Sequence, residues 1–309
     1  MLGVLGFSLS LPLTKVAVEE LDPVFVGLGR ALVAAGLAAL YLLAVRSPLP
    51  TRRQAARLGL VSLGVVFGFP LFTALALQDL PSAHSAVIVG LLPAATAILA
   101  VARAGERPSL SFWLAAGTGL AAVLAFAAVE GAGAPRMADL FVLAAVALAA
   151  LGYAEGGALS RELGGPRVIS WALVLSVPLL APVVVLGAAG ASFEAGASAW
   201  ASFAYLSLVS MFLGFFAWYR GLALGGVARI GQVQLLQPLL TLGWSALLLG
   251  ERFGVLTVAI ALLVLLSVIA TQRAAVAGAV TLPEPRDARP NRLGTATGLH
   301  SPLGRDARR

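Results

Sequence analysis

Cysteine is absent from the 309 residues, and histidine occurs only at His84 and His300. Without cysteine there are no disulfides, no cysteine-ligated zinc and no iron–sulfur clusters, and two histidines argue against haem or a histidine metal site. The phosphate-binding pattern GxxxxGK[ST] is also absent, which argues against an ATP-driven pump in this chain. The sequence therefore predicts neither a metal nor a cofactor.

Charge is scarce as well, because only 11% of the residues are charged, whereas 60% are hydrophobic and the mean hydropathy is +0.96. A soluble globular domain carries about 25% charged residues, which it needs to cover its surface. Uncharged apolar stretches recur from Leu2 to Ala270. This composition excludes a soluble enzyme with one large core and predicts an integral membrane protein made of many helices.

Much of the net charge of +7 lies in the last segment, residues 273–309. Seven of its residues are arginine and three are acidic, which leaves +4 there and only +3 in the preceding 272 residues. A basic segment beside a membrane marks the cytoplasmic side and contacts anionic lipid, so we favour that role over nucleic-acid binding. The segment has no aromatics and is rich in Pro, Gly, Arg and Ala, which predicts a disordered tail.

Charged or Pro/Gly-rich breaks divide the rest of the chain into ten apolar segments, each near the roughly 20 residues with which a helix crosses a bilayer. They are residues 2–18, 24–45, 58–77, 82–102, 110–129, 139–159, 168–190, 199–219, 229–249 and 253–271. Backbone groups find no water in hydrocarbon, so helices are the default, and the continuous apolar runs lack the alternation of a β-barrel. We therefore expect an all-α integral membrane protein with ten transmembrane helices.

The arginines predict the orientation, because short loops rich in Lys and Arg stay in the cytoplasm. If both termini lie there, seventeen arginines fall in inner loops and the tail, and only Arg136 and Arg252 fall in outer loops. We therefore expect a multi-pass protein of the cytoplasmic membrane with both termini inside. Only Leu2–Leu13 is uncharged before Lys15, which makes the first span short, as a clipped start site would. The first segment lacks a basic region and cleavage site, so we interpret it as a retained helix and not as a signal peptide.

Two ungapped self-matches indicate an internal repeat. Residues 5–15 (LGFSLSLPLTK) align with residues 151–161 (LGYAEGGALSR) at an offset of 146. Further on, Pro93 stands thirteen residues before the Glu of a Gly-Glu-Arg motif, and Pro238 stands thirteen before the Glu of a second one, at an offset of 145. Two blocks at nearly the same offset, both with charged residues, favour duplication of a five-helix unit.

An odd number of helices per unit turns the second copy upside down in the membrane. We therefore expect an inverted repeat, with a first half at 1–135, a second half at 136–272 and the tail at 273–309. Inverted repeats place a substrate pathway between the halves, which opens alternately to either side. A duplication kept only for folding is the alternative, and we favour transport.

Several short motifs together resemble those of one known family. They are Gly-Glu-Arg before an apolar helix, Leu21-Asp22-Pro23 before a helix with Arg30, Tyr219-Arg220-Gly221-Leu222-Ala223-Leu224, and the Gln237-Pro238 helix. In these residues the chain is similar to the EamA family of the drug/metabolite transporter superfamily, over residues 1–272. The resemblance implies ten helices in two EamA repeats and movement of small metabolites across the cytoplasmic membrane, often export of amino acids or related compounds. It implies no particular substrate, because members differ widely in what they carry.

Ionisable groups inside a span are costly, so each needs a reason. Glu155 lies in the sixth apolar segment, beside Tyr153 and the Gly156-Gly157 pair. One hypothesis is that Glu155 binds a substrate amine or a coupling proton. The other is a structural ion pair with Arg161 or Arg220.

Arg30 lies within the second apolar segment and is the other intramembrane candidate. Its guanidinium offers a fork of donors that suits a substrate carboxylate. The alternative, which we favour, is that Arg30 pairs with the acidic cluster Glu19-Glu20-Asp22 outside.

The ninth segment carries a polar stripe, with Gln234, Gln237, Thr241 and Ser245 spaced three, four and four residues apart on one helix face. Such a stripe lines a solvated path or hydrogen-bonds neighbouring helices. Both roles stay open for Gln234 and Thr241, and Gln237 is our preferred site. Pro238 permits a kink, as Pro93 does in the fourth segment.

Aromatic residues are the remaining candidates for a cavity lining: Phe67, Phe69, Phe72, Tyr153, Trp171, Trp218 and Tyr219. Trp and Tyr near helix ends are more often interface anchors than cavity residues. We favour the anchor role for Trp171 and Tyr219, and we give both roles equal weight for Trp218. We interpret the two Gly-Glu-Arg motifs as structural markers and His84 as a solvated end residue.

Three classes of function fit a chain of this kind. The first is a secondary transporter or facilitator for a small-molecule substrate, an exporter in our interpretation. The second is a membrane-embedded enzyme on lipid-linked substrates, which would need clustered acids or a nucleophile with a base, whereas Glu155 stands nearly alone. The third is a non-transporting scaffold. We favour the first, and the sequence contains no signal for the oligomeric state.

Overall fold

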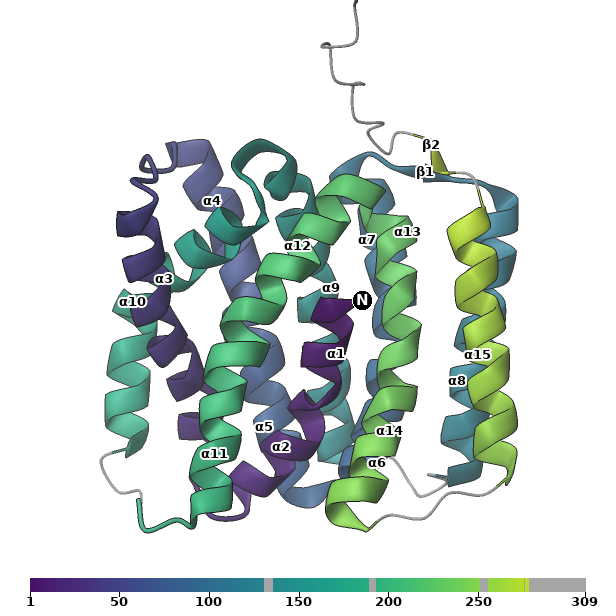
Figure 1. Cartoon of the computed structure of the whole chain (residues 1–309), viewed down its shortest axis with the longest axis horizontal. Coiled ribbons are helices and arrows are strands. Elements are labelled where there is room, and N and C mark those ends of the chain that lie inside the picture. Colours follow the sequence, from purple (N-terminus) through teal and green to yellow (C-terminus); the bar gives the residue numbers. More distant parts are fainter. Residues whose placement is uncertain (131–135, 189–192, 251–254, 275, 278–309) are drawn as a thin grey trace, which may run out of the picture.

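The computed structural model describes residues 1–130, 136–188, 193–250, 255–274 and 276–277. The tail from residue 278 and the Glu251-Arg252 part of the second Gly-Glu-Arg motif lie outside the described residues. Within the described part the protein is all-α, apart from a short antiparallel ladder between β1 (Arg107–Pro108) and β2 (Val276–Ala277). The helices stand side by side and form a bundle, whose two ends lie at the top and bottom of Figure 1.

Helices of the first half follow the apolar segments closely. They are α1 (Leu2–Ser8), α2 (Ser10–Val18), η1 (Phe25–Gly29), α3 (Arg30–Ala44), α4 (Arg52–Val61), η2 (Ser62–Gly68), α5 (Phe69–Asp79), α6 (Ser82–Val89), α7 (Leu92–Ala104) and α8 (Leu110–Glu130). Those of the second half are α9 (Met137–Leu163), α10 (Gly165–Ala188), α11 (Ala197–Tyr205), η3 (Leu206–Leu213), α12 (Gly214–Gly225), α13 (Val227–Gly231), η4 (Gln232–Leu235), α14 (Leu236–Leu249) and α15 (Val255–Arg273).

Five helical stretches among the described residues are long and apolar enough to cross a membrane. They are Phe25–Ala44, Arg52–Asp79, Met137–Leu163, Gly165–Gly187 and Ala197–Gly225. Shorter apolar helices occupy Leu2–Val18, Leu92–Arg103 and Leu110–Ala122. The prediction of an all-α, multi-pass membrane protein is therefore confirmed.

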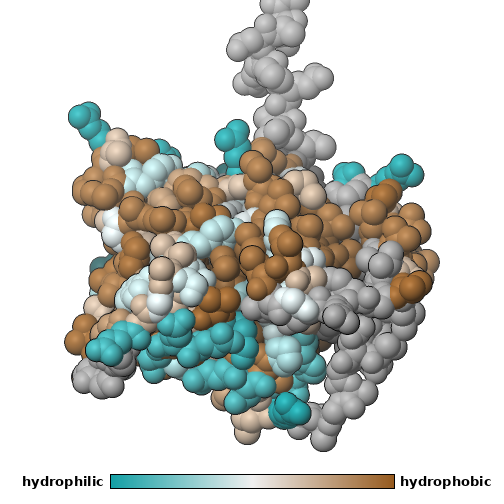
Figure 2. All heavy atoms as spheres, turned by 60° about the horizontal axis from the view of Figure 1, so that its bottom comes forward, coloured by the Kyte–Doolittle hydropathy of each residue, from teal (hydrophilic) through white to brown (hydrophobic). Residues whose placement is uncertain are grey.

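The outer surface of the bundle has the pattern expected of a protein in a bilayer. Large apolar side chains are exposed along the helices, including Leu40, Leu43, Leu179, Leu186 and Leu247. Figure 2 shows hydrophilic residues gathered over the end that lies at the bottom of Figure 1, next to a broad hydrophobic surface. Water would not favour such a surface, whereas lipid chains contact it at little cost.

Several of the helices are locally irregular, which the apolar segments did not predict. Leu9 separates α1 from α2, so the first segment is a broken helix. Three stretches, η1, η2 and η3, are π-helical, and η4 is a tighter 3-10 turn. Pro93 is the second residue of α7, after the break at Gly90 and Leu91, and Pro238 is the third residue of α14, after η4. Proline lacks the backbone donor that a continuous helix needs, so both prolines stand where helices restart.

Glycine allows the long helix α9 to pack tightly against both halves. A Cβ on Gly152 would lie 2.7 Å from a methyl carbon of Val65 in η2. A Cβ on Gly156, one turn on, would lie 2.5 Å from the hydroxyl oxygen of Tyr219, which donates a hydrogen bond of 3.0 Å to the carbonyl of Gly152. Small residues at such crossings let membrane helices approach closely.

Candidate substrate pocket and ion-pair clusters

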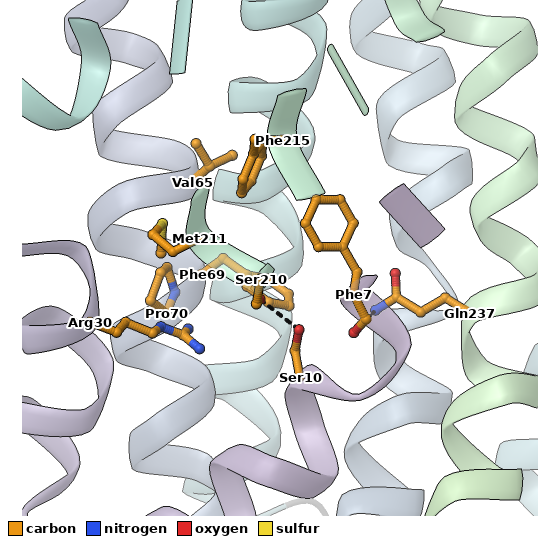
Figure 3. Close-up of a pocket in the computed structure, with 10 residues that line it drawn as sticks. All are labelled: Phe7, Ser10, Arg30, Val65, Phe69, Pro70, Ser210, Met211, Phe215 and Gln237. Carbon is orange, nitrogen blue, oxygen red and sulfur yellow. Dashed lines mark hydrogen bonds between the residues drawn. The ribbon is translucent and has the colours of Figure 1, made fainter. Parts of the chain in front are cut away.

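A pocket with an empty volume of about 330 Å³ lies between the two halves of the chain. The first half contributes Phe7, Ser10, Arg30, Val65, Phe69 and Pro70, and the second half contributes Ser210, Met211, Phe215 and Gln237. Figure 3 shows these side chains around a common space, below Val65 and Phe215 and between Arg30 and Gln237. This volume includes space that is open to the surroundings, so the enclosed part of the pocket is smaller.

Every residue that lines the pocket lies in an irregular segment or within two residues of one. Val65 belongs to η2, Ser210 and Met211 belong to η3, and Arg30 follows η1 directly. Phe7 and Ser10 flank the break between α1 and α2. Such turns disturb the regular helix ladder and are common at functional sites.

Arg30 is the only ionisable residue among the ten that line the pocket. Its side chain is 2% exposed, and its Nε and Nη1 atoms have no hydrogen-bond partner. In Figure 3 its guanidinium points toward Ser10 and Ser210. An arginine at membrane depth costs about 2.5–3.5 kcal/mol even on the lenient insertion scale, so an unpaired one is a strong sign of function.

The expected pairing of Arg30 with the outer acidic cluster is wrong. Asp22 accepts a hydrogen bond from the backbone N–H of Phe25 at 2.9 Å and thereby caps the start of η1. Glu20 accepts one from the backbone N–H of Gly196 at 2.5 Å. These two acids are engaged at the end of the bundle, while the Arg30 side chain points into the pocket.

Neutral polar groups form the opposite wall of the pocket. The hydroxyls of Ser10 and Ser210 are 2.7 Å apart. Gln237 accepts a hydrogen bond of 2.9 Å from Gln234, whose amide also reaches the hydroxyl of Tyr153 at 3.3 Å. Gln237 therefore lines the pocket, and Gln234 and Tyr153 lie behind it.

The rest of the polar stripe connects helices. Thr241 donates a hydrogen bond of 2.8 Å to the carbonyl of Ser8 in α1, and the hydroxyl of Ser245 is 2.9 Å from that of Ser82 in α6. Trp218 is buried, with its ring 6.1 Å from that of Phe7 and 5.4 Å from that of Tyr153. It therefore supports the aromatic wall of the pocket from outside.

Glu155 is the centre of an ion-pair cluster that joins the halves. Its carboxylate is buried and pairs with Arg57 of α4 through one oxygen and with Arg103 of α7 through the other, at 2.8 Å. Arg57 also pairs with Glu162 at 2.7 Å. Glu155 is thus paired, but with arginines of the first half and not with Arg161 or Arg220.

Glu106 of the first Gly-Glu-Arg motif forms a second connection at the same end. Its buried carboxylate pairs with Arg161 at 2.6 Å and accepts hydrogen bonds from the backbone N–H groups of Val227 and Ala228 at 2.6 and 2.7 Å. Gly105 ends α7 in the left-handed conformation, with φ of 68°, which turns the chain toward this contact. Glu106, in a motif that we interpreted as a structural marker, therefore forms an ion pair and caps a helix of the other half.

Two further expectations about single residues need correction. Tyr219 is fully buried against Gly156, so it is no interface anchor. His84 is half-buried and lies 2.7 Å from a carboxylate oxygen of Asp139, so it is not a solvated end residue. Trp171 is half-buried and donates to the hydroxyl of Ser47 at 3.1 Å, and its role as an interface anchor stays a prediction. Each pairs with a residue far away in the chain, which explains why the sequence did not indicate it.

Sequence reasoning missed most of the pocket walls. Ser10, Ser210, Met211 and Phe215 carry no charge, motif or periodicity that distinguishes them from other residues of an apolar helix. The nearest signal was the repeat itself, because an inverted repeat predicts a site between the halves. Among the described residues, no group of three or more His, Cys, Asp or Glu side chains is arranged to hold a metal ion.

A helical bundle with lipid-suited flanks and a pocket between its two halves defines a multi-pass membrane protein of the transporter type. The model of the EamA-like transporter family matches residues 1–128 and again residues 136–272. The chain therefore belongs to the EamA-like transporter family, within the drug/metabolite transporter superfamily.

One relative supports this assignment, and one solved structure shares the fold. A Bacillus subtilis (strain 168) protein described as "Uncharacterized transporter YdeK" is 47% identical over 272 residues, which are 88% of this chain and 95% of that protein. A solved structure titled "Crystal structure of protein" has a TM-score of 0.68 and 17% identity, over 87% of this chain and 93% of that one. The latter shows a shared fold. Family and relative together make this protein a membrane transporter.

Proposed function

We propose that this protein is a secondary transporter or facilitator that exports small metabolites, amino-acid-like compounds or drugs, across the cytoplasmic membrane. It works by alternating access between two inverted five-helix repeats, residues 1–135 and 136–272. Ten helices cross the membrane, and both termini and the tail lie in the cytoplasm.

The observation that supports this proposal is the pocket between the halves. Six of its lining residues come from the first half and four from the second, so any relative motion of the halves changes its walls. Irregular helical turns beside every lining residue provide places where the helices bend.

The ion-pair clusters support a closed cytoplasmic side in this conformation. Glu155 and Glu106 both join the halves at the end where α4 begins and α7 and α9 end. The seventeen arginines of the inner loops and tail predict that this end is cytoplasmic. Opening toward the cytoplasm would then require these pairs to separate.

The test compares the extracellular metabolites of cells with and without the protein, followed by flux of the changed compounds in vesicles that contain the purified chain. An exporter changes a few compounds in the medium, and the vesicles reproduce their movement. An unchanged medium together with no flux in vesicles would favour the scaffold interpretation. A compound that is chemically altered, and not merely moved, would favour the enzyme.

A further inference from the structure

We propose that the pocket recognises a small organic carboxylate with an apolar or aromatic body, held by Arg30. This inference rests on the proposed function and narrows its substrate class. It singles out compounds of net charge −1 over neutral compounds and over zwitterions such as amino acids.

The pocket carries a positive charge that no neighbouring side chain neutralises. Arginine stays protonated in proteins, so the Arg30 side chain brings a full positive charge into the space between the halves. None of the other nine lining residues is ionisable, and none of the salt bridges among the described residues includes Arg30. Its buried Nε and Nη1 donors have no partner. An anion is the ligand that would neutralise this site.

The guanidinium of Arg30 favours a planar anion. The planar guanidinium donates two parallel hydrogen bonds to a carboxylate, which a spherical ion cannot accept in the same geometry. The paired hydroxyls of Ser10 and Ser210 lie on the side toward which the guanidinium points, and they have lone pairs and rotatable protons for the ligand. A carboxylate between Arg30 and this pair would accept hydrogen bonds from one edge of the guanidinium and neutralise its charge.

The other walls of the pocket suit an apolar or aromatic body of the ligand. Phe7, Phe69, Phe215 and Met211 supply most of the remaining wall, and aromatic and thioether surfaces favour an apolar or aromatic group. The pocket has no carboxylate for an ammonium group, and the Gln237 carbonyl is already engaged with Gln234. A zwitterion would therefore bring one charge without a partner, which a buried site disfavours.

The experiment measures the melting temperature of the detergent-solubilised full chain against increasing 3-phenylpropionate, 3-phenylpropionamide or L-phenylalanine. The acid and its amide have nearly the same shape, so they differ mainly in charge. A ligand that binds the folded state raises the melting temperature with its concentration. We expect the acid to stabilise the protein, and the amide and phenylalanine to bind about tenfold more weakly or worse.

Matched variants test whether Arg30 is the residue that binds the acid. Arg30→Gln should lose the preference for the acid over the amide, and Arg30→Lys should keep part of it, because the charge remains while the fork is lost. Arg52→Gln, which removes an exposed arginine of α4, should behave like the unchanged protein. If Arg30→Gln does not fold, the acid–amide comparison on the unchanged protein decides by itself.

Four results would overturn the inference. On the unchanged protein they are equal stabilisation by the acid and the amide, no stabilisation by the acid up to about 10 mM, and stabilisation by inorganic phosphate equal to that by the acid. The fourth is that Arg30→Gln keeps the preference for the acid over the amide. Phosphatidylglycerol added in place of phosphatidylcholine tests a lipid headgroup as the anion, and stabilisation by it that the acid does not displace also counts against the inference. Metabolite flux is measured separately, so transport without acid binding would refute the substrate class and leave the transporter intact.

Discussion

The hydroxyls of Ser10 and Ser210 are 2.7 Å apart, although 200 positions separate the two residues in the chain. Ser10 begins α2 just after the helix break, and Ser210 lies within the π-helical stretch η3. The bond therefore joins the two halves at the pocket, between two segments that depart from the regular helix. Alternating access predicts that contacts of this kind are made and broken during transport.

The pair offers a direct test of that motion, because the chain has no cysteine of its own. In the double variant Ser10→Cys/Ser210→Cys we expect an oxidant to form a disulfide and stop flux, since it locks the halves together. A reductant should restore flux. Each single variant serves as a control and should be insensitive to the oxidant. Full flux through the cross-linked protein would contradict a pathway that opens at this contact.

Glu155→Gln should weaken the connection between the halves at the end with the ion-pair clusters. The change removes the charge that Arg57 and Arg103 share, and we expect a loss of about 1–3 kcal/mol in the free energy of unfolding, toward the lower figure because both arginines are partly exposed. Thermal unfolding in detergent measures it. Glu162→Gln is the matched control, because its carboxylate is half-exposed and should matter less.

The same variant separates the two hypotheses for Glu155. Both carboxylate oxygens are occupied by arginines, so the geometry favours the structural role. We therefore expect Glu155→Gln to lower flux by the same factor at every pH between 6 and 8 (about a tenfold span of proton concentration on either side of neutrality). A flattened pH profile would instead indicate that Glu155 carries a coupling proton.

Gly156→Ala should destabilise the protein by about 1–3 kcal/mol, as overpacking of a close-packed contact does. The added carbon would lie 2.5 Å from the hydroxyl oxygen of Tyr219, which is fully buried and has nowhere to move. Gly59→Ala in α4 is the control, because nothing lies within 4 Å of its added carbon. Alanine is the better helix former, so this control should be neutral or gain up to about 1 kcal/mol. Equal melting temperatures for both variants would show that α9 does not need the close approach.

Membrane orientation can be measured with single cysteines at the two ends of the bundle. Arg53 of α4 and Ser198 of α11 are both exposed, and the two helices lie toward opposite ends of the bundle in Figure 1. We expect a membrane-impermeant maleimide to label Ser198→Cys in intact cells, and to label Arg53→Cys only after lysis. The reverse pattern would place the termini outside and would assign the ion-pair clusters to the outer side.

Much of the architecture could be predicted because it depends on local composition. Apolar runs predicted the helices, since the backbone must satisfy its own hydrogen bonds in lipid. Interruptions within those helices could not be predicted in this way. Leu9 and the π-helical turns interrupt runs that look uniform in the sequence. We infer that their positions depend on side chains of other helices that pack against them, which a single segment does not reveal.

Arg30 and Glu155 show the same limit at the level of single residues. Both were recognised from sequence as costly charges within a span, and for both the expected partner was wrong. Glu155 pairs with arginines that are 98 and 52 positions away in the chain. Arg30 lines the pocket and does not pair with the acids that are near it in the sequence. Proximity in sequence is a poor guide to pairing in a bundle where each helix packs against helices that are distant in the chain.

Composition and motifs by themselves determined that this is an integral membrane protein, that it is helical and that it resembles a family of transporters. The first two properties follow from the free-energy cost of exposing polar backbone and charge to hydrocarbon. This cost applies to each segment independently of the rest of the chain. Only the tertiary structure decided that the buried carboxylate of Glu155 is paired and that the buried guanidinium of Arg30 is not. That outcome depends on which helix faces meet, and it makes Glu155 part of a connection between the halves and Arg30 the unpaired cation of the pocket.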